Sequence, residues 1–520
     1  MARKRLKSIQ FGATSALAAA ASAALLLLVG CPPSPGDCPD RLRCPSDATG
    51  SSGSGGGSTS TTASASSAGG GGGMVIDPCD PTDQDNTGLT SCGIFVRNEG
   101  SDGNSGAADH PVATLAKAVE LAVGKGHVYA CNQTFAENLV LTKGVTLHGG
   151  LDCKAGWAYS GPLAVPTVLA PIAGVPLVLK NGPARARVRS FHLLAQPGSA
   201  PGQSSIAVIA AGSTVVIEDT RIDAGDASSG VDGVDQSMTP NPTAPDGLAG
   251  GNACTAPSVP GGSAKDNACG TSTGGKGGDG EVASGGAGGP GAPSGGAAGA
   301  GESGLGWACA PSGLGQPGAP GLDGSNGGGG LSRGQIGEDG YRGANGADGD
   351  PGKPGLAGGG GGGRAGAQCS GKAGAAGGSG APGGCGGKGG GGGMAGGSSI
   401  GLLSAGSSVL LKNTVITTGN GGVGGRGFDA QPGADGGKGG VGGMALGGAP
   451  AGCAGGDGGP GGHGGAGGGG RGGHSIGVAH DGPLSLPEGN SIIVGSAGPG
   501  GTSKGDNDGN MGESGASLQF

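Results

Sequence analysis

The chain contains few of the residues that build the core of an ordinary enzyme. Aromatic residues make up 2% of its 520 residues, hydrophobic residues 34% and charged residues 13%. By contrast, the chain contains 138 glycines and 34 prolines, residues that interrupt helices and strands. This composition excludes a globular catalytic domain over the whole length, and it leaves enough apolar side chains for about one core.

Basic residues are also scarce. Lys and Arg total 29 against 37 Asp and Glu, which gives a formal net charge of -8. Nucleic-acid binding needs basic patches to neutralise phosphates and aromatic side chains to stack on bases. We therefore expect no nucleic-acid partner.

The first 30 residues have the pattern of an export signal. Basic residues around Lys4 precede an apolar stretch that is too short for a comfortable membrane span. Residues 28–31, which read Leu-Val-Gly-Cys, resemble the lipobox of bacterial lipoproteins. The resemblance implies that Cys31 is lipidated, and Pro32 after it implies the outer membrane or the cell surface. The alternative is a simple secretory signal, with Cys31 as one more disulfide thiol.

Thirteen cysteines in an exported chain predict disulfides. None shows the paired spacing of a zinc site, and among the scattered histidines only His463, His474 and His480 approach a cluster. We therefore expect no metal and no cofactor.

Composition divides the chain into a tether, a β-rich core and glycine-rich insertions. One run has Val112, Leu115, Val119 and Ala122 at helical spacing, and short β-type runs separated by turns follow it. The expected order is a lipoprotein signal peptide (1–30), a Ser/Gly/Pro-rich tether (31–93), the first part of the core (94–225), a glycine-rich insertion (226–397), one coil (398–419), a second insertion (420–473), one coil (474–497) and a polar tail (498–520).

Residues 94–225 contain a pattern of turn residues followed by spaced apolar positions. It includes Gly100, Asp102, Asn104, Gly106, Pro111, Thr114, Leu115, Phe135, Glu137, Leu139, Leu141, Gly144, Leu147 and Gly149. This pattern resembles the N-terminal cap and first coils of the pectate-lyase-like superfamily. That resemblance implies an all-β fold, a right-handed parallel β-helix solenoid with one N-terminal capping helix. It implies no particular activity, because the superfamily includes lyases, hydrolases, adhesins and proteins without known catalysis.

An internal repeat supports the same fold independently. Residues 204–225 align without gaps on residues 398–419, with 10 of 22 positions identical, and a looser copy begins at Ser475. A solenoid tolerates long insertions between coils because each coil contacts only its neighbours. We expect the insertions to leave from one corner, and we expect two sets of isoleucines to stack: Ile206, Ile400 and Ile476, and Ile222, Ile416 and Ile492.

The insertions leave two conformations open. Residues 315–327 and 334–358 keep glycine at every third position, but a collagen triple helix needs three chains and longer runs. The segments are either disordered polar loops or extended strands packed as a polyglycine-II-like bundle with disulfide cross-links.

Asp219, Arg221 and Asp223 are the best catalytic or Ca²⁺-binding candidates. In β-helix lyases, carboxylates on neighbouring coils bind Ca²⁺ and a nearby Arg takes the proton. The second repeat, however, has Asn413 and Thr417 at the two acidic positions, so no ladder of acids forms. We therefore assign no catalytic residue with preference.

Cys131 and Cys153 are 22 residues apart, the length of the repeat. One turn of the solenoid would bring them within disulfide distance, and Cys92 is the nearest rival partner.

We expect a surface-anchored lipoprotein with a structural, adhesive or matrix-interaction role and without catalysis. The alternative is a polysaccharide-active β-helix enzyme, a lyase or a hydrolase. The expected partners are the membrane, through the lipid anchor, and extracellular polysaccharide or other envelope proteins.

Overall fold

The computed structural model describes residues 78–82, 88–161, 163–482, 484–504 and 506–520. The expected signal peptide, the lipidation site Cys31 and most of the tether lie outside these residues. The chain falls into two units, Met1–Gly73 and Met74–Phe520, and every described residue belongs to the second. None of the described helices is long and apolar enough to cross a bilayer.

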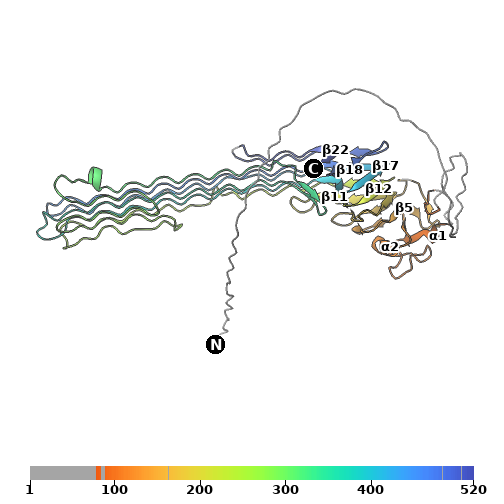
Figure 1. Ribbon diagram of the computed structural model, residues 1–520, viewed down its shortest axis with the longest axis horizontal. Coiled ribbons are helices and arrows are strands. Elements are labelled where there is room, and N and C mark those ends of the chain that lie inside the picture. Colours follow the sequence, from red (N-terminus) through yellow and green to blue (C-terminus); the bar gives the residue numbers. More distant parts are fainter. Residues whose placement is uncertain (1–77, 83–87, 162, 483, 505) are drawn as a thin grey trace, which may run out of the picture. The chain divides into compact units, whose positions relative to one another are not determined.

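Parallel β-strands, arranged in three sheets, form most of the regular structure (Figure 1). The first sheet has the order β1 (Gly93–Val96), β2 (His127–Cys131), β5 (Thr146–Asp152), β9 (Ala186–Arg189), β12 (Thr214–Glu218), β17 (Ser408–Lys412) and β20 (Leu484–Ser485), with β6 (Ala158–Tyr159) antiparallel to β5. The second contains β3 (Thr134–Phe135), β7 (Thr167–Leu169), β10 (Phe191–Ala195), β13 (Arg221–Ala224), β18 (Val415–Thr418) and β21 (Ser491–Ile493). The third contains β4 (Leu139–Leu141), β8 (Leu177–Leu179), β11 (Ser205–Ala211), β16 (Ser399–Ala405), β19 (Ser475–His480) and β22 (Ser514–Gln519).

From β2 onward, the chain visits the three sheets in a repeating order, first, second and third. Each pass adds one strand beside the strand of the previous pass. This arrangement is compatible with a β-helix-like solenoid.

The register predicted from the internal repeat is confirmed. Ile206 pairs with Ile400 and Ile400 with Ile476 in the third sheet. In the second sheet, Ile222 pairs with Ile416 and Ile416 with Ile492. The glycine-rich segments after β13, β18 and β21 all run from the second sheet to the third, so they leave from the same corner.

The helix α2 (Leu115–Leu121) covers the core at the β1 end. Leu115 and Ala118 are fully buried in the main core cluster. The Asp102 carboxylate accepts the N–H groups of Ala113 and Thr114, and the Glu137 carboxylate accepts the N–H of Leu115 (2.8 Å). Asp102 and Glu137 thus satisfy N–H groups at the start of the helix, which would otherwise be unpaired. This role explains why both acids occur in the residue pattern that resembles an N-terminal cap.

The third sheet is apolar on both faces. Its outer face carries Ile206, Ile209, Ile400, Leu403 and Ile476, all nearly inaccessible to solvent. An antiparallel hairpin from within the first insertion, β14 (Gln335–Gly337) and β15 (Gly340–Arg342), packs Ile336 and Tyr341 against this face. Because both faces are covered, these strands contain continuous apolar runs instead of an alternating pattern.

The folded part is larger than expected at both ends. The short helix α1 (Leu89–Cys92) precedes β1, and Asp80 forms an ion pair with Arg189 of the first sheet (2.7 Å). Residues 78–82 and 88–93 are therefore packed structure, although the composition predicted a tether there. The segment expected to be a polar tail contributes β22 to the third sheet.

The insertions form a bundle of long extended segments that run side by side (Figure 1). We call this the glycine bundle; its main segments are residues 226–253, 313–330, 344–365, 373–397, 420–446 and 450–473. A short turn, η2 (Cys309–Gly313), whose backbone is non-helical at Ala310, lies near the end far from the sheets.

Every third residue of a segment donates its N–H to the same neighbour. Gly349, Gly352 and Gly355 donate to Gly390, Gly387 and Gly384, each at 2.9 Å. The residues one position later donate to a different segment, as Asp350 does to Ser325 (2.9 Å). This period of three is that of a polyglycine-II-like bundle, not of a pleated sheet.

Candidate functional site

Glycine is required inside the glycine bundle because the backbones pack directly against each other. A Cβ on Gly389 would overlap the carbonyl oxygen of Gly349, and one on Gly327 would overlap that of Ala347. A Cβ on the neighbouring Gly328 would meet nothing within 4 Å. The distinction between required and replaceable glycines therefore depends on which way each position faces.

Aspartate and asparagine side chains complete the hydrogen bonding at the bundle surface. The N–H of Arg426 donates to the Asp232 carboxylate (2.8 Å), while its carbonyl accepts the N–H of Gly233 (2.8 Å). The Asp–Gly pair of one segment thus forms hydrogen bonds with both the N–H and the carbonyl of one residue in the neighbouring segment. We call an Asp or Asn that accepts an N–H of a neighbouring segment in this way an Asx clamp.

Asx clamps recur along the bundle. Between parallel segments, Asp226, Asp246, Asn252, Asp323 and Asn326 accept the N–H groups of Asn420, Lys438, Met444, His463 and Ala466. Between antiparallel segments, Asp279, Asn345, Asp348 and Asp457 accept those of Gly261, Ala395, Gly392 and Gly439. In the sequence, each of these clamp residues is an Asp or Asn directly before Gly or Ala. The sequence-based predictions above do not assign them this role.

Several clamps hold carboxylates in the ionised form. The hydrogen bonds from the backbone and guanidinium of Arg426 lower the pKa of Asp232. The backbone N–H of Gly261 lowers the pKa of Asp279, and that of Gly439 lowers the pKa of Asp457. The bundle surface is therefore cross-linked by ionised acids at neutral pH.

Disulfides join bundle segments that are distant in sequence: Cys254–Cys369, Cys269–Cys385 and Cys309–Cys453, with separations of 115, 116 and 144 residues. They are of the kind that persists in an oxidising compartment, so the folded part belongs outside the reducing cytoplasm.

Cys131 forms a disulfide with Cys153, and Cys92 pairs with Cys79. The Cα atoms of Cys131 and Cys153 are 5.3 Å apart. The strand partner of Cys131, however, is Leu151, because the register shifts between Tyr129 and Cys131. This coil is thus shorter than the 22-residue repeat, and Cys153 reaches Cys131 from just beyond the end of β5.

The structure brings together two of the three catalytic candidates. Arg221 Nε and His192 Nε2 lie 2.7 Å and 2.8 Å from the same oxygen of Asp223. Burial alone would raise the pKa of Asp223, but the hydrogen bonds from His192 and Arg221 outweigh it and lower the pKa. Asp223 is therefore an ionised acid that its neighbours already engage.

Asp219 belongs to a different group. It lies in the turn between β12 and β13 with φ of 48°, and Asn413 occupies the equivalent turn of the next coil with φ of 45°. Asp and Asn tolerate this left-handed conformation better than other non-glycine residues, which accounts for the pair. Asp219 Oδ2 lies 3.0 Å from Arg189 Nε. Asp219 therefore forms its ion pair with Arg189 and not with Arg221.

Arg189 is the centre of a partly buried charge network on the first sheet. It contacts Asp80 (2.7 Å), Asp219 (3.0 Å) and Glu218 (3.6 Å). Desolvation lowers the pKa of the nearby buried His148 to about 3, with a further contribution from His127. This network fastens residues 78–82 to the sheet.

Among the described residues, no three His, Cys, Asp or Glu side chains converge as metal ligands would. The histidines that sequence inspection singled out have separate contacts. His463 accepts the N–H of Gly433 (3.2 Å), His474 is buried beside Tyr341, and His480 contacts the carbonyl of Gly482 (2.7 Å).

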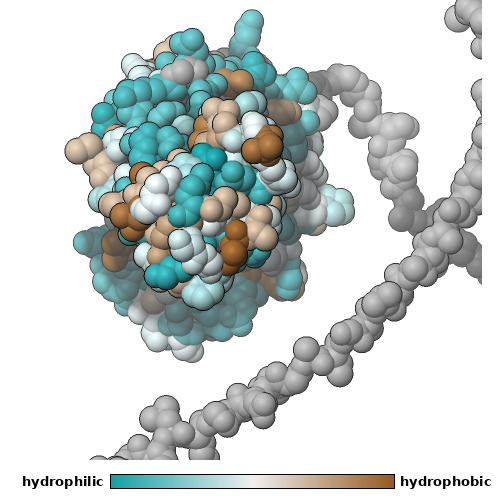
Figure 2. Space-filling model, turned by 90° about the vertical axis from the view of Figure 1, so that its left-hand side faces the viewer, coloured by the Kyte–Doolittle hydropathy of each residue, from teal (hydrophilic) through white to brown (hydrophobic). Residues whose placement is uncertain are grey.

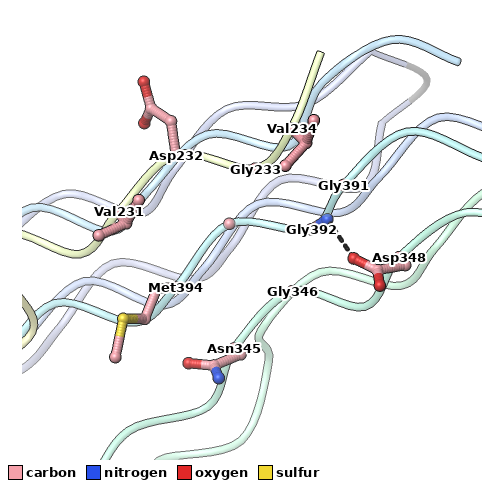
Figure 3. A pocket seen from close by; sticks show the side chains of 11 residues that line it. Val231, Asp232, Gly233, Val234, Asn345, Gly346, Asp348, Gly391, Gly392 and Met394 are labelled. Carbon is pink, nitrogen blue, oxygen red and sulfur yellow. Dashed lines mark hydrogen bonds between the residues drawn. The ribbon is translucent and has the colours of Figure 1, made fainter. Parts of the chain in front are cut away.

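A shallow hollow of about 450 Å³ lies on the glycine bundle (Figure 3). It lies where three segments meet, and its lining includes Val231, Asp232, Val234, Asp348, Met394 and the glycines of residues 391–393. Within it, the Asp348 carboxylate accepts the N–H of Gly392 (2.7 Å), which is one of the Asx clamps (Figure 3). The far end of the bundle displays interspersed hydrophilic and hydrophobic side chains (Figure 2), and Leu305 is fully exposed. The two acids that line the hollow, Asp232 and Asp348, both already accept backbone N–H groups as Asx clamps.

Comparisons with protein-family models, curated proteins and solved structures give no match for this chain.

Proposed function

We propose that the chain is a lipoprotein anchored at the cell surface through Cys31, in which a right-handed parallel β-helix carries the glycine bundle as a rigid contact element. Its role is structural or adhesive, toward extracellular polysaccharide or other envelope proteins. The observation that carries the proposal is the bundle itself, a large ordered surface fastened by Asx clamps and disulfides.

The dimensions of the bundle support a role in contact at a distance. Residues 420–446 form one run of the bundle, and at about 3.1 Å per residue such a run is roughly 80 Å long. The hydrogen bonds of each segment go to its neighbours, so the length is fixed and does not fluctuate as it would in a flexible linker. A long and rigid element is of little use for small-molecule catalysis, whereas it suits a protein that has to reach another surface.

The side chains on the bundle also favour contact. The outward positions carry a mixture of short polar, charged and apolar residues, such as Val231, Asp232, Leu322, Val441 and Met444. Exposed surfaces of mixed polarity resemble protein–protein interfaces more than ligand pockets.

The proposal is tested in cells that carry the full chain. One variant replaces residues 226–330 and 344–397 by short linkers, keeps the hairpin of residues 335–342 over the third sheet, and shortens residues 420–473. We expect it to reach the surface and to lose attachment to neighbouring cells or matrix, whereas Gly328→Ala retains it. Unchanged attachment without the bundle would contradict the contact role.

The anchor is tested separately. Cys31→Ser should leave the chain exported but release it from the membrane fraction, and wild-type cells should incorporate radiolabelled fatty acid into the protein. Firm membrane association of Cys31→Ser would exclude the lipidation site.

The cluster of His192, Arg221 and Asp223 supports a second candidate, a polysaccharide-active enzyme. A screen of acidic polysaccharides for unsaturated products that absorb in the ultraviolet tests it. Asp235 is an exposed acid of the first insertion, outside this cluster, and serves as the control. Activity that disappears in Asp223→Asn and persists in Asp235→Asn would favour this candidate over the contact role.

A further inference from the structure

The two ends of the stacked sheets differ in how they are covered. At the β1 end, α2 places Leu115 and Ala118 into the core. At the other end, β20, β21 and β22 are the last strands of the three sheets. No described helix or hairpin covers this end, and Ile493 remains 59% exposed.

The sequence of β22 has few of the features that keep a sheet edge from pairing, although Arg333 from the first insertion donates to the Gln519 carbonyl at its end (3.4 Å). Residues 514–519 read Ser-Gly-Ala-Ser-Leu-Gln, without a charge, a proline or a large side chain that would block approach. The N–H of Ser475 donates to the Glu513 carbonyl, so the N–H of Ser514, on the opposite side of the same peptide, points away from β19. The strand therefore offers backbone groups to a further strand.

A hollow of about 630 Å³ lies at the same end, lined by His480, Asp481, Leu484, Ser517 and Gln519 among others. Leu484 and Ile492, which pack against the main core cluster, are only partly buried. The unpaired strand edges and the incompletely covered core thus occur together.

We propose that this end binds the same end of a second copy of the chain, with β22 pairing antiparallel to β22 of the other copy. Self-association is favoured because the three edge strands are arranged around one core, and only a coil of the same cross-section meets all three edges at once. A twofold axis through the middle of β22 also places β20 of each copy against β21 of the other. The interface is then isologous, as in most symmetric dimers.

In this arrangement Ala516 lies beside the twofold axis, opposite Ser517 of the other copy. Ala516 is exposed and does not belong to any core cluster. Ala516→Lys therefore brings two like charges together only in the dimer, and Ala516→Ser is the matched control. The proposal does not depend on the lipid anchor or on the contact role of the bundle.

Sedimentation equilibrium of the full chain tests the interface, with Cys31→Ser in every sample so that lipid does not drive association. We expect dimers for the parent and for Ala516→Ser, and at least a tenfold weaker dimer for Ala516→Lys. Amide hydrogen exchange provides a second readout: residues 514–519 should exchange more slowly as the concentration rises. A monomeric parent, or dimers that Ala516→Lys leaves unchanged, would overturn the proposal.

Discussion

Gly327 and Gly328 provide a matched pair for testing how the glycine bundle is held together. The N–H of Gly327 donates to the Ala466 carbonyl (2.8 Å), and a Cβ there would overlap the Ala347 carbonyl oxygen. Overpacking costs about 1–3 kcal/mol, and a lost hydrogen bond about 0.5–1.5 kcal/mol. Gly327→Ala should therefore lower the local free energy of opening by about 2–4 kcal/mol.

Gly328→Ala should have the opposite sign. Its Cβ has open space, and its carbonyl still accepts the N–H of Ala347 (2.9 Å). Alanine restricts the unfolded chain more than glycine does, so the variant should be neutral or more stable by up to about 1 kcal/mol.

Amide hydrogen exchange followed by mass spectrometry measures both effects. In peptides from residues 344–365 and 450–473, Gly327→Ala should accelerate exchange by roughly 30-fold to several hundred-fold, since 1.4 kcal/mol corresponds to a factor of ten. Gly328→Ala should leave these peptides unchanged or slower. Equal acceleration by both variants would refute direct backbone packing at Gly327.

Three further predictions concern the core and its surface charges. Replacing both Cys131 and Cys153 by Ser should lower the free energy of unfolding of the first coils by about 3 kcal/mol, the chain-entropy value for a 22-residue loop, measured by guanidinium denaturation with Trp157 fluorescence; an unchanged midpoint would contradict it. Acid should destabilise the first coils and the glycine bundle over two different pH ranges. Buried His148, whose pKa is lowered to about 3, binds protons more readily when unfolded, so the first coils should lose stability as the pH falls from about 6.5 toward 3. Asp232, Asp279 and Asp457 have lowered folded-state pKa values, so their contribution to the bundle is present above about pH 4 and is lost as the pH falls through those values. Protection of the two regions against amide exchange, corrected for the intrinsic exchange rate at each pH, should therefore fall over different pH ranges, and a loss of protection in both regions over the same range would contradict this. Deleting residues 226–397 should expose Ile206 and Ile400 and cause aggregation, whereas a deletion that retains residues 331–343 should stay monodisperse in light scattering; equal behaviour of the two deletions would show that the hairpin does not protect this face.

The coil register could be predicted because the repeat is gapless and apolar residues recur at fixed positions. Ile222 and Ile416 are 194 residues apart, yet each has to occupy the same site on a coil to reach the core. The insertion between them does not affect this requirement, since a solenoid coil contacts only its neighbours.

The hairpin over the third sheet could not be predicted in the same way. Ile336 and Tyr341 are isolated large residues within glycine-rich sequence, and no periodicity assigns them to a strand. The continuous apolar runs of β11 and β16 were an indirect signal, because a strand with two apolar faces needs a cover on each.

The candidate acids show a different limit. Asp219 and Asp223 are close in sequence, which suggested a common site, but a left-handed turn at Asp219 directs the two side chains to different partners, Arg189 and His192. Likewise, the Asx clamps depend on which segments become neighbours, and that order is set by the fold of the whole bundle.

The disulfides of the glycine bundle test its ordered packing most directly. Non-reducing peptide mapping of the exported protein should recover fragments that join Cys254 to Cys369, Cys269 to Cys385 and Cys309 to Cys453. These pairings, which span 115 to 144 residues, require the segments to lie side by side as described. Free thiols at these positions, or a mixture of other pairings, would contradict an ordered bundle.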